Sequence, residues 1–182
     1  MTLQFTRILY LLALFLLPLS VVPLHSASAT DVTEKDVLTI ARTIGFLQNA
    51  PKDDVVLHIL YDPAVPTSAR EAQDIYNLAD RTKGAIKLRP KLITIGQITA
   101  LQNRNFVFVT SGMQGHSNVI SSHLTKHDIL SFALERPCIE RKSCVVYINT
   151  GAGRVEIVVD KEAAESQGIS FKPVFLMMVT TL

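Results

Sequence analysis

Cys138 and Cys144 are the two cysteines of the chain, and their position predicts a disulfide bond. Five residues separate them, including the charged Glu140 and Arg141, which is typical of an exposed loop leading into a strand. The start of the chain predicts export, and cysteine pairs of exported proteins tend to oxidise. Two interpretations stay open, a structural crosslink that never changes state and a redox-sensitive clasp. The spacing matches no zinc motif, so we expect no metal at this pair.

Histidines are the next residue type that could do chemistry. His123 and His127 lie four residues apart and would share one face of a helix, where His116 could join them around zinc or copper. No carboxylate or cysteine at ligand spacing completes such a site, and Asp128 would point elsewhere on a helix. We therefore predict no metal, and we interpret His123 and His127 as solvated residues near a helix end.

The segment Thr110-Ser111-Gly112 is the candidate ligand-binding site. It follows the cleanest buried strand of the chain and leads towards a helix. In open α/β sheets, ligands collect beyond the carboxyl ends of strands, and the N-termini of helices attract anions. A small-ligand pocket at Thr110, Ser111 and Gly112 is one interpretation, and an ordinary strand-to-helix loop is the other.

No pattern in the chain indicates catalysis. There is no G-x-S-x-G and no H-E-x-x-H sequence. Gly151-Ala152-Gly153 joins two predicted strands and lacks the third glycine of a dinucleotide-binding motif. Glu135 and Glu140 fall in the charged loop region and are interpreted as solvated. We therefore predict that the protein is not an enzyme and needs no cofactor.

Alternating periodicities predict the elements that must position these residues. The helical segments span 31–48 with Thr33 as N-cap, Thr67 or Ser68 to Arg81, 97–102, 117–126, and 161–167 before Gly168. Strands are predicted over 55–61, 86–95, 105–110 and 129–134, with Pro90 placing the second near a sheet edge. Residues 144–148 and 154–159 predict a hairpin, and 171–182 a final helix or strand. This order predicts an α/β fold: a single-domain sandwich with a mixed β-sheet flanked by helices, ending in a β-hairpin and short helices.

The first 29 residues are typical of a secretory signal peptide. Arg7 precedes an apolar run over residues 8–24, and Ala27-Ser28-Ala29 forms a small-x-small cleavage site. We expect residues 1–29 to be removed and residues 30–182 to form one exported domain, which is not itself membrane-spanning after cleavage. The formal charge of +2 then falls to +1 with the loss of Arg7, which offers no basic face and argues against nucleic-acid binding.

Several segments of the chain resemble the YfiR-like family of periplasmic proteins. The segments are Ile44-Gly45-Phe46 approaching Pro51, the strand and loop at 106–111, and the closing stretch at 153–160 with Ala163-Ala164, Gly168-Ile169 and the apolar tail 174–179. The chain has no tryptophan, a residue often found in the family before the proline, and its two cysteines allow a single disulfide.

The resemblance implies a function as well as a fold. YfiR-like proteins are exported α/β domains that can form homodimers. A member of the family represses an inner-membrane diguanylate cyclase by binding its periplasmic sensor region. The resemblance therefore implies a periplasmic regulator of cyclic-di-GMP signalling that acts by protein–protein contact. A periplasmic small-ligand-binding module that uses Thr110, Ser111 and Gly112 is the alternative.

We predict that the exported protein starts at Thr30. The reason is that Ala27-Ser28-Ala29 places small residues where the signal peptidase requires them. Mass spectrometry of the periplasmic fraction checks this expectation. A full-length chain retained in the membrane would contradict it.

Overall fold

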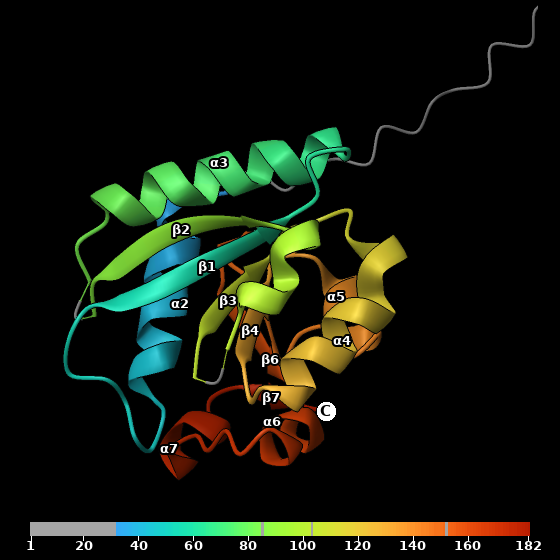
Figure 1. Cartoon of the computed structure of the whole chain (residues 1–182). Coiled ribbons are helices and arrows are strands. Elements are labelled where there is room, and N and C mark those ends of the chain that lie inside the picture. Colours follow the sequence, from blue (N-terminus) through green and yellow to red (C-terminus); the bar gives the residue numbers. More distant parts are fainter. Residues whose placement is uncertain (1–31, 85, 103, 152) are drawn as a thin grey trace, which may run out of the picture.

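Seven strands form one mixed sheet in the order β2-β1-β3-β4-β5-β6-β7 (Figure 1). The computed structural model describes residues 32–84, 86–102, 104–151 and 153–182, so the predicted signal peptide lies outside the described residues. The strands are β1 (Val55–Tyr61), β2 (Leu88–Thr94), β3 (Phe106–Val109), β4 (Leu130–Ala133), β5 (Val146–Asn149), β6 (Glu156–Val159) and β7 (Thr180–Thr181). Strands β1 to β5 are mutually parallel, β6 runs antiparallel to β5, and β7 pairs in parallel with β6.

Helices cover both faces of this sheet. The α-helices are α2 (Glu34–Gly45), α3 (Pro66–Arg81), α4 (Ser117–Lys126), α5 (Arg136–Glu140), α6 (Lys161–Ser166) and α7 (Pro173–Leu176), and the 3₁₀ turns are η1 (Ile95–Ala100) and η2 (Gln114–His116). The predicted single-domain α/β fold is confirmed. Within the described residues, no helix is long and apolar enough to cross a membrane.

Alternation along the strands divides the core into two layers. Leu57, Phe108 and Phe132 point to the face covered by α2 and α3. Leu60 and Val109 point to the opposite face, where η1 and α4 pack. Successive strand side chains face opposite sides, so parallel strands buried on both faces carry unbroken apolar runs. This is why Phe106–Val109 was so clear in the sequence.

Helix boundaries follow local chemistry. Thr33 caps α2 as predicted, because its hydroxyl accepts the N–H of Asp36 while the Asp36 carboxylate accepts the N–H of Thr33. The predicted Thr67 or Ser68 cap of α3 is wrong. Helix α3 begins at Pro66, a residue suited to the first helical position, and Val65 precedes it without a side-chain cap. Gly168 ends α6 in the left-handed region, with φ of 63°.

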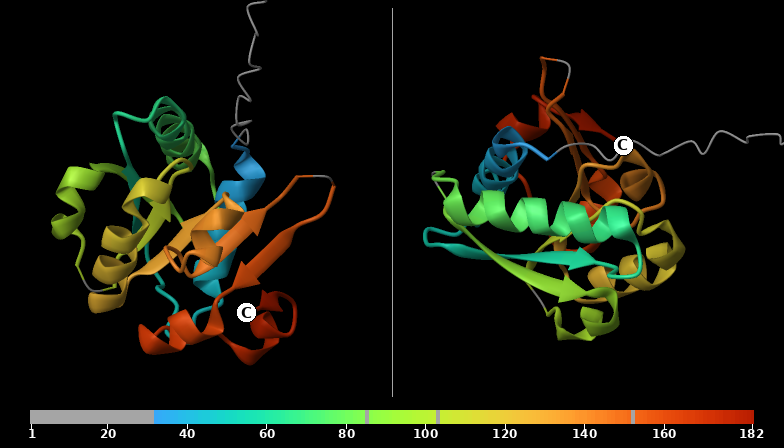
Figure 2. Two further views of the ribbon diagram at one scale, coloured as in Figure 1. Left: turned by 90° about the vertical axis from the view of Figure 1, so that its right-hand side faces the viewer. Right: turned by 90° about the horizontal axis from the view of Figure 1, so that it is seen from above.

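The C-terminal segment forms a separate end of the molecule, opposite α3 (Figure 2). The Phe175 ring lies 4.9 Å from that of Phe46 and 5.1 Å from that of Phe171. A bridge between Leu47 and Phe171 fixes this segment to the end of α2. The predicted final helix or strand is therefore both, with α7 followed by the short edge strand β7.

We predict that Phe175→Ala lowers the free energy of unfolding by about 3–5 kcal/mol, since it empties a buried aromatic site. Met177→Ala, two residues away and exposed, should change it by less than about 0.5 kcal/mol. Urea unfolding of both variants measures the difference. Equal effects would show that the ring cluster does not stabilise the fold.

Candidate functional site

The carboxyl ends of β1, β3 and β4 form the candidate site. The sheet order reverses at β1, because β2 lies on one side of it and β3 on the other. Ligands of open α/β sheets bind where the order reverses in this way. The loop after β3 carries Thr110, Ser111 and Gly112, the residues of the predicted ligand site. They lie at the carboxyl end of the strands, as the sequence predicts.

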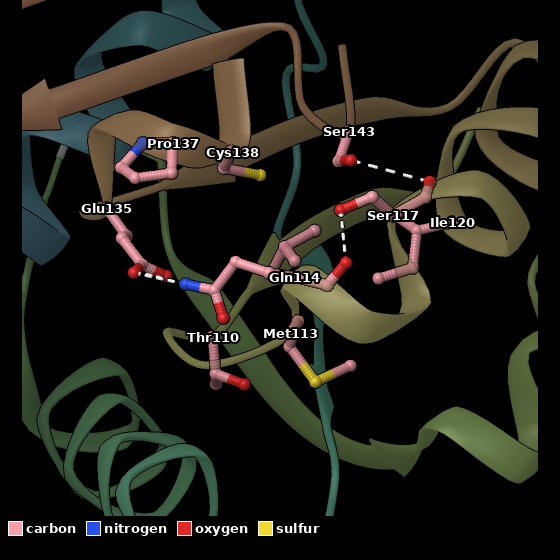
Figure 3. Close-up of a pocket in the computed structure, with 10 residues that line it drawn as sticks. Thr110, Met113, Gln114, Ser117, Ile120, Glu135, Pro137, Cys138 and Ser143 are labelled. Carbon is pink, nitrogen blue, oxygen red and sulfur yellow. Dashed lines mark hydrogen bonds between the residues drawn. The ribbon is translucent and has the colours of Figure 1, made fainter. Parts of the chain in front are cut away.

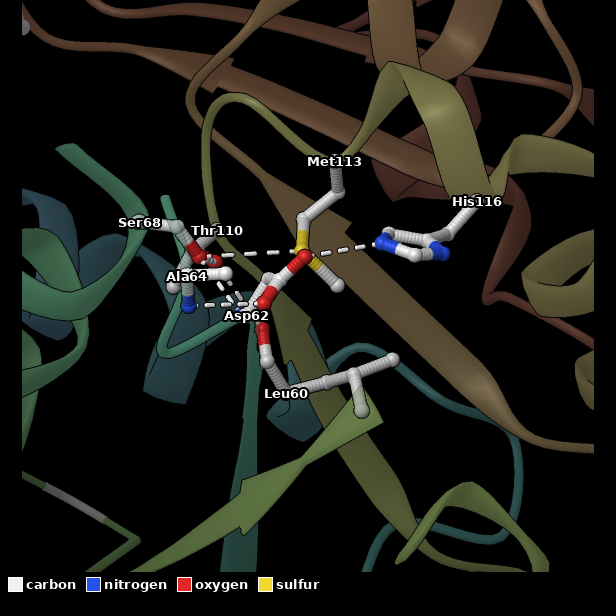
Figure 4. Close-up of polar contacts among 7 residues, drawn as sticks. All are labelled: Leu60, Asp62, Ala64, Ser68, Thr110, Met113 and His116. Carbon is white, nitrogen blue, oxygen red and sulfur yellow. Dashed lines mark hydrogen bonds and ion pairs between the residues drawn. The ribbon is translucent and has the colours of Figure 1, made fainter. Parts of the chain in front are cut away.

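A chain of buried hydroxyl groups joins the two loops at this edge (Figure 4). The Thr110 hydroxyl donates to the carbonyl oxygen of Leu60 at 3.0 Å. The Ser68 hydroxyl lies 2.6 Å from the Thr110 hydroxyl and accepts the N–H of Asp62 at 2.9 Å. Because Thr110 already donates to Leu60, Ser68 donates to Thr110. The Thr110 side chain therefore links β1, β3 and α3 within the core, rather than facing a ligand.

Two glutamates bind the backbone of the loop. Glu71 of α3 accepts the N–H of Ser111, and Glu135 after β4 accepts the N–H of Gly112 at 3.0 Å. Glu135 also accepts a hydrogen bond from the side chain of Gln114. Consecutive N–H groups that converge in this way make an anion-binding concavity. The carboxylates of the chain itself occupy the donors that an anionic ligand would need.

Glu71 is the most perturbed carboxyl group at this edge. Its side chain is buried, and its Oε1 atom has no hydrogen-bond partner among the residues described. Burial raises the pKa of Glu71 to about 7, the Ser111 hydrogen bonds oppose this rise, and the charges of Glu135 and Asp74 add to it. A carboxyl group without full solvation favours its neutral form, so Glu71 exchanges a proton near neutral pH.

Gly112 fits the loop tightly against the start of α3. Its φ is 81°, a conformation that L residues rarely adopt. A Cβ atom there would lie 2.8 Å from Cγ1 of Val65 and 3.2 Å from Oγ1 of Thr67. The same loop is held by His116, whose Nε2 lies 2.8 Å from Oδ2 of Asp62. The Ala64 backbone hydrogen bond and then the His116 side chain lower the pKa of Asp62.

A small cavity lies beside these contacts (Figure 3). Its lining includes Thr110, Gln114, Ser117, Glu135 and Cys138. Its volume of about 10 Å³ is close to what a single water molecule needs. A larger ligand at Thr110, Ser111 and Gly112 would have to displace the glutamates and open the loop.

Cys138 and Cys144 do not lie in the predicted exposed loop. Cys138 belongs to α5, and Cys144 is buried two residues before the start of β5. Both residues carry free thiols. The distance between the two cysteines is 2.7 Å, which is close but longer than the S–S bond of about 2.05 Å in a disulfide. Burial, followed by the neighbouring Cys138, raises the pKa of the Cys144 thiol. The disulfide stays a prediction, now for two cysteines that the fold brings together.

The three histidines that were considered as metal ligands do not converge on one site. The rings of His123 and His127 lie 4.5 Å apart, so these residues share a face as predicted. However, Nε2 of His123 lies 3.0 Å from the carbonyl oxygen of Leu101, while His116 contacts Asp62. Across the described ranges, no group of three or more His, Cys, Asp or Glu residues could hold a metal ion.

Sequence reasoning missed Ser68, Glu71 and Glu135 as members of this site. Glu135 was interpreted as solvated, but its side chain is half-buried and accepts two hydrogen bonds. Glu71 lies on the apolar face of α3, between the buried Ser68 and Ala72. A carboxylate in the apolar stripe of a helix was the one signal that could have identified it.

Comparison with known proteins shows the fold alone. No family model matches the chain, and no curated protein matches it. A solved structure of a conserved domain protein from Vibrio cholerae O1 biovar El Tor strain N16961 is similar, with a TM-score of 0.57 and 14% identity. The match covers 81% of this chain and 59% of that one, so this chain spans less than two thirds of its length.

We predict that Glu71→Gln removes a pH dependence of stability. Because the pKa of Glu71 is raised in the folded protein, protonation of Glu71 favours the folded state. This contribution to the free energy of unfolding is fully present below pH 4.5 and is lost as the pH rises through about 7. Glutamine stays neutral, so its advantage over glutamate should grow by about 3 kcal/mol between pH 4.5 and pH 8. Urea unfolding at both pH values measures it.

Asp80→Asn is the matched control, because Asp80 is an exposed carboxylate on the same helix and is not among the charges that raise the pKa of Glu71. Its effect on the free energy of unfolding should be nearly the same at both pH values. A Glu71→Gln effect that does not change with pH would contradict the assignment of a neutral Glu71.

Proposed function

We propose that this chain is an exported regulatory protein of the periplasm that acts by contact with an inner-membrane signalling protein. The proposed partner is the periplasmic sensor region of a diguanylate cyclase, which the protein represses or modulates. The signal-peptide pattern and the YfiR-like segments support the compartment and the class of partner. One structural observation supports the mode of action, an exposed apolar surface at the C-terminal end.

This surface, called here the α7 surface, consists of Val174, Met177 and Met178. Their side chains are 49%, 79% and 61% exposed, respectively. Large exposed apolar side chains that lie together favour an interaction site over scattered surface residues. Methionine adapts to irregular partner surfaces, because it is unbranched and polarisable.

The α7 surface rests on a fixed base. Phe175 lies between these residues in sequence, is 2% exposed and packs on Phe46 and Phe171. A partner would therefore meet side chains whose backbone is already ordered, which lowers the entropy cost of binding. Phe171 and Phe175 are buried in the core, so their side chains do not belong to this surface.

The alternative function, a small-ligand module at Thr110–Gly112, has less support. The N–H groups of Ser111 and Gly112 are bound to Glu71 and Glu135, and the adjacent cavity has room for about one water. Contact through the α7 surface needs no such rearrangement.

Cyclic-di-GMP measurement in the producing bacterium tests the proposal. Deleting the gene for this protein should raise the cyclic-di-GMP level if the protein represses a cyclase. Wild-type protein should restore the level, and a variant with Met177→Glu and Met178→Glu should not, because truncating or charging an interface anchor typically costs about 2 kcal/mol or more of binding free energy.

Val119→Glu is the matched control. Val119 is 54% exposed and lies on α4 rather than in the α7 surface, so this variant should restore the level. Equal periplasmic amounts and equal melting temperatures verify that the variants fold. Full restoration by the methionine variant would overturn the assignment of the α7 surface. An unchanged cyclic-di-GMP level after deletion would overturn the cyclase as target.

A further inference from the structure

A second cavity lies at the opposite, amino-terminal edge of the parallel strands. It is an open groove of about 540 Å³, formed by the segments 47–49, 104–106, 128–130 and 167–170. Its lining combines polar side chains with the apolar residues Leu47, Phe106, Leu130 and Ile169. This volume lies within the range of about 300–1,000 Å³ that small-molecule sites usually have.

Two opposite charges line this groove, Arg104 and Asp128. They lie in the turns that precede β3 and β4, two residues before the paired strand positions Phe106 and Leu130. Both residues adopt positive φ, 66° for Arg104 and 51° for Asp128. Their side chains are exposed and form no ion pair with each other or with another described residue.

A buried acceptor in the groove also lacks a donor. Gln167 is 5% exposed, and its Nε2 donates to Oγ1 of Thr125 at 3.3 Å. Its Oε1 is buried and finds no hydrogen-bond partner within the described part of the chain. A buried polar atom without a partner is rare in folded proteins. This wall of the groove therefore differs from the carboxyl edge, where the loop N–H groups are paired.

We propose that this groove binds an α-amino acid with an apolar side chain. The Arg104 guanidinium matches the α-carboxylate, which it can bind through two parallel hydrogen bonds. Asp128 matches the α-ammonium group, and the apolar residues of the lining receive the side chain. An amino acid carries both charges on one carbon, which suits opposite charges in the turns before two paired strands. The evidence for this site does not depend on the proposed contact function.

Isothermal titration calorimetry of the exported domain, residues 30–182, with L-leucine tests the site. We expect saturable binding with one site per chain. N-acetyl-L-leucine lacks the ammonium group, L-leucinamide lacks the carboxylate and glycine lacks the side chain, so each should bind at least tenfold more weakly. Binding of all four compounds with equal affinity, or no binding of L-leucine at 10 mM, would overturn the proposal.

Charge-removing variants locate the site. Arg104→Asn and Asp128→Asn should each weaken L-leucine binding at least tenfold, and asparagine tolerates the left-handed backbone of both positions. Arg154→Asn and Asp80→Asn remove exposed charges elsewhere and should leave the affinity unchanged. Melting temperatures within the range of the controls verify folding. Unchanged affinity in both groove variants would place any leucine binding outside this groove.

Discussion

The hydrogen bonds from the N–H groups of Ser111 and Gly112 to Glu71 and Glu135 determine the arrangement of the carboxyl edge. Strand β3 ends there in a half-buried loop, and N–H groups that are removed from water need other acceptors. The two carboxylates come from α3 and from the segment after β4, so these bonds fix both elements relative to β3. Hydrogen bonding of Ser68 to Thr110 and Asp62 adds a third connection. The positions of α3, η2 and α5 all depend on this loop.

This arrangement also explains why the edge is closed. Many sheets of this kind leave the loop N–H groups free for the phosphate or carboxylate of a ligand. Here two internal carboxylates fill the same concavity, and Gly112 lies too close to Val65 for any side chain. The cost is a buried carboxyl group at Glu71 whose pKa is raised by burial. The fold tolerates this cost because neutral Glu71 still accepts the Ser111 N–H.

Local signals in the sequence predicted most of the elements and few of the contacts. The strand Val55–Tyr61 and the helix Ser117–Lys126 have their predicted bounds, because an unbroken apolar run and a 3.6-residue stripe are properties of neighbouring residues. The edge position of Pro90 and the late hairpin are confirmed for the same reason. The roles of Glu71 and Glu135 depend on partners 40 and 23 residues away, which no local pattern encodes. The buried position of Cys144 was missed because the exposed charges before it do not report its own burial: Glu140 ends α5, and Arg141 and Lys142 form the turn that follows.

The two edges of the sheet have opposite hydrogen-bonding states, and this difference bears on regulation. The groove wall Gln167–Ser170 leads directly into α7, and the Ser170 carbonyl accepts the N–H of Gln48 at 2.8 Å. The Phe46 carbonyl likewise accepts the N–H of Lys172 at 2.8 Å, so the groove and the base of the α7 surface share one hydrogen-bonded segment. A ligand shifts a conformational equilibrium only by its differential affinity for the two states. The loop N–H groups at the carboxyl edge are already hydrogen-bonded to Glu71 and Glu135, so a ligand would gain little by binding them. Arg104 and Asp128 form no ion pair within the described part of the chain, so the ligand proposed for the amino-terminal edge would act on α7 through the segment 167–172.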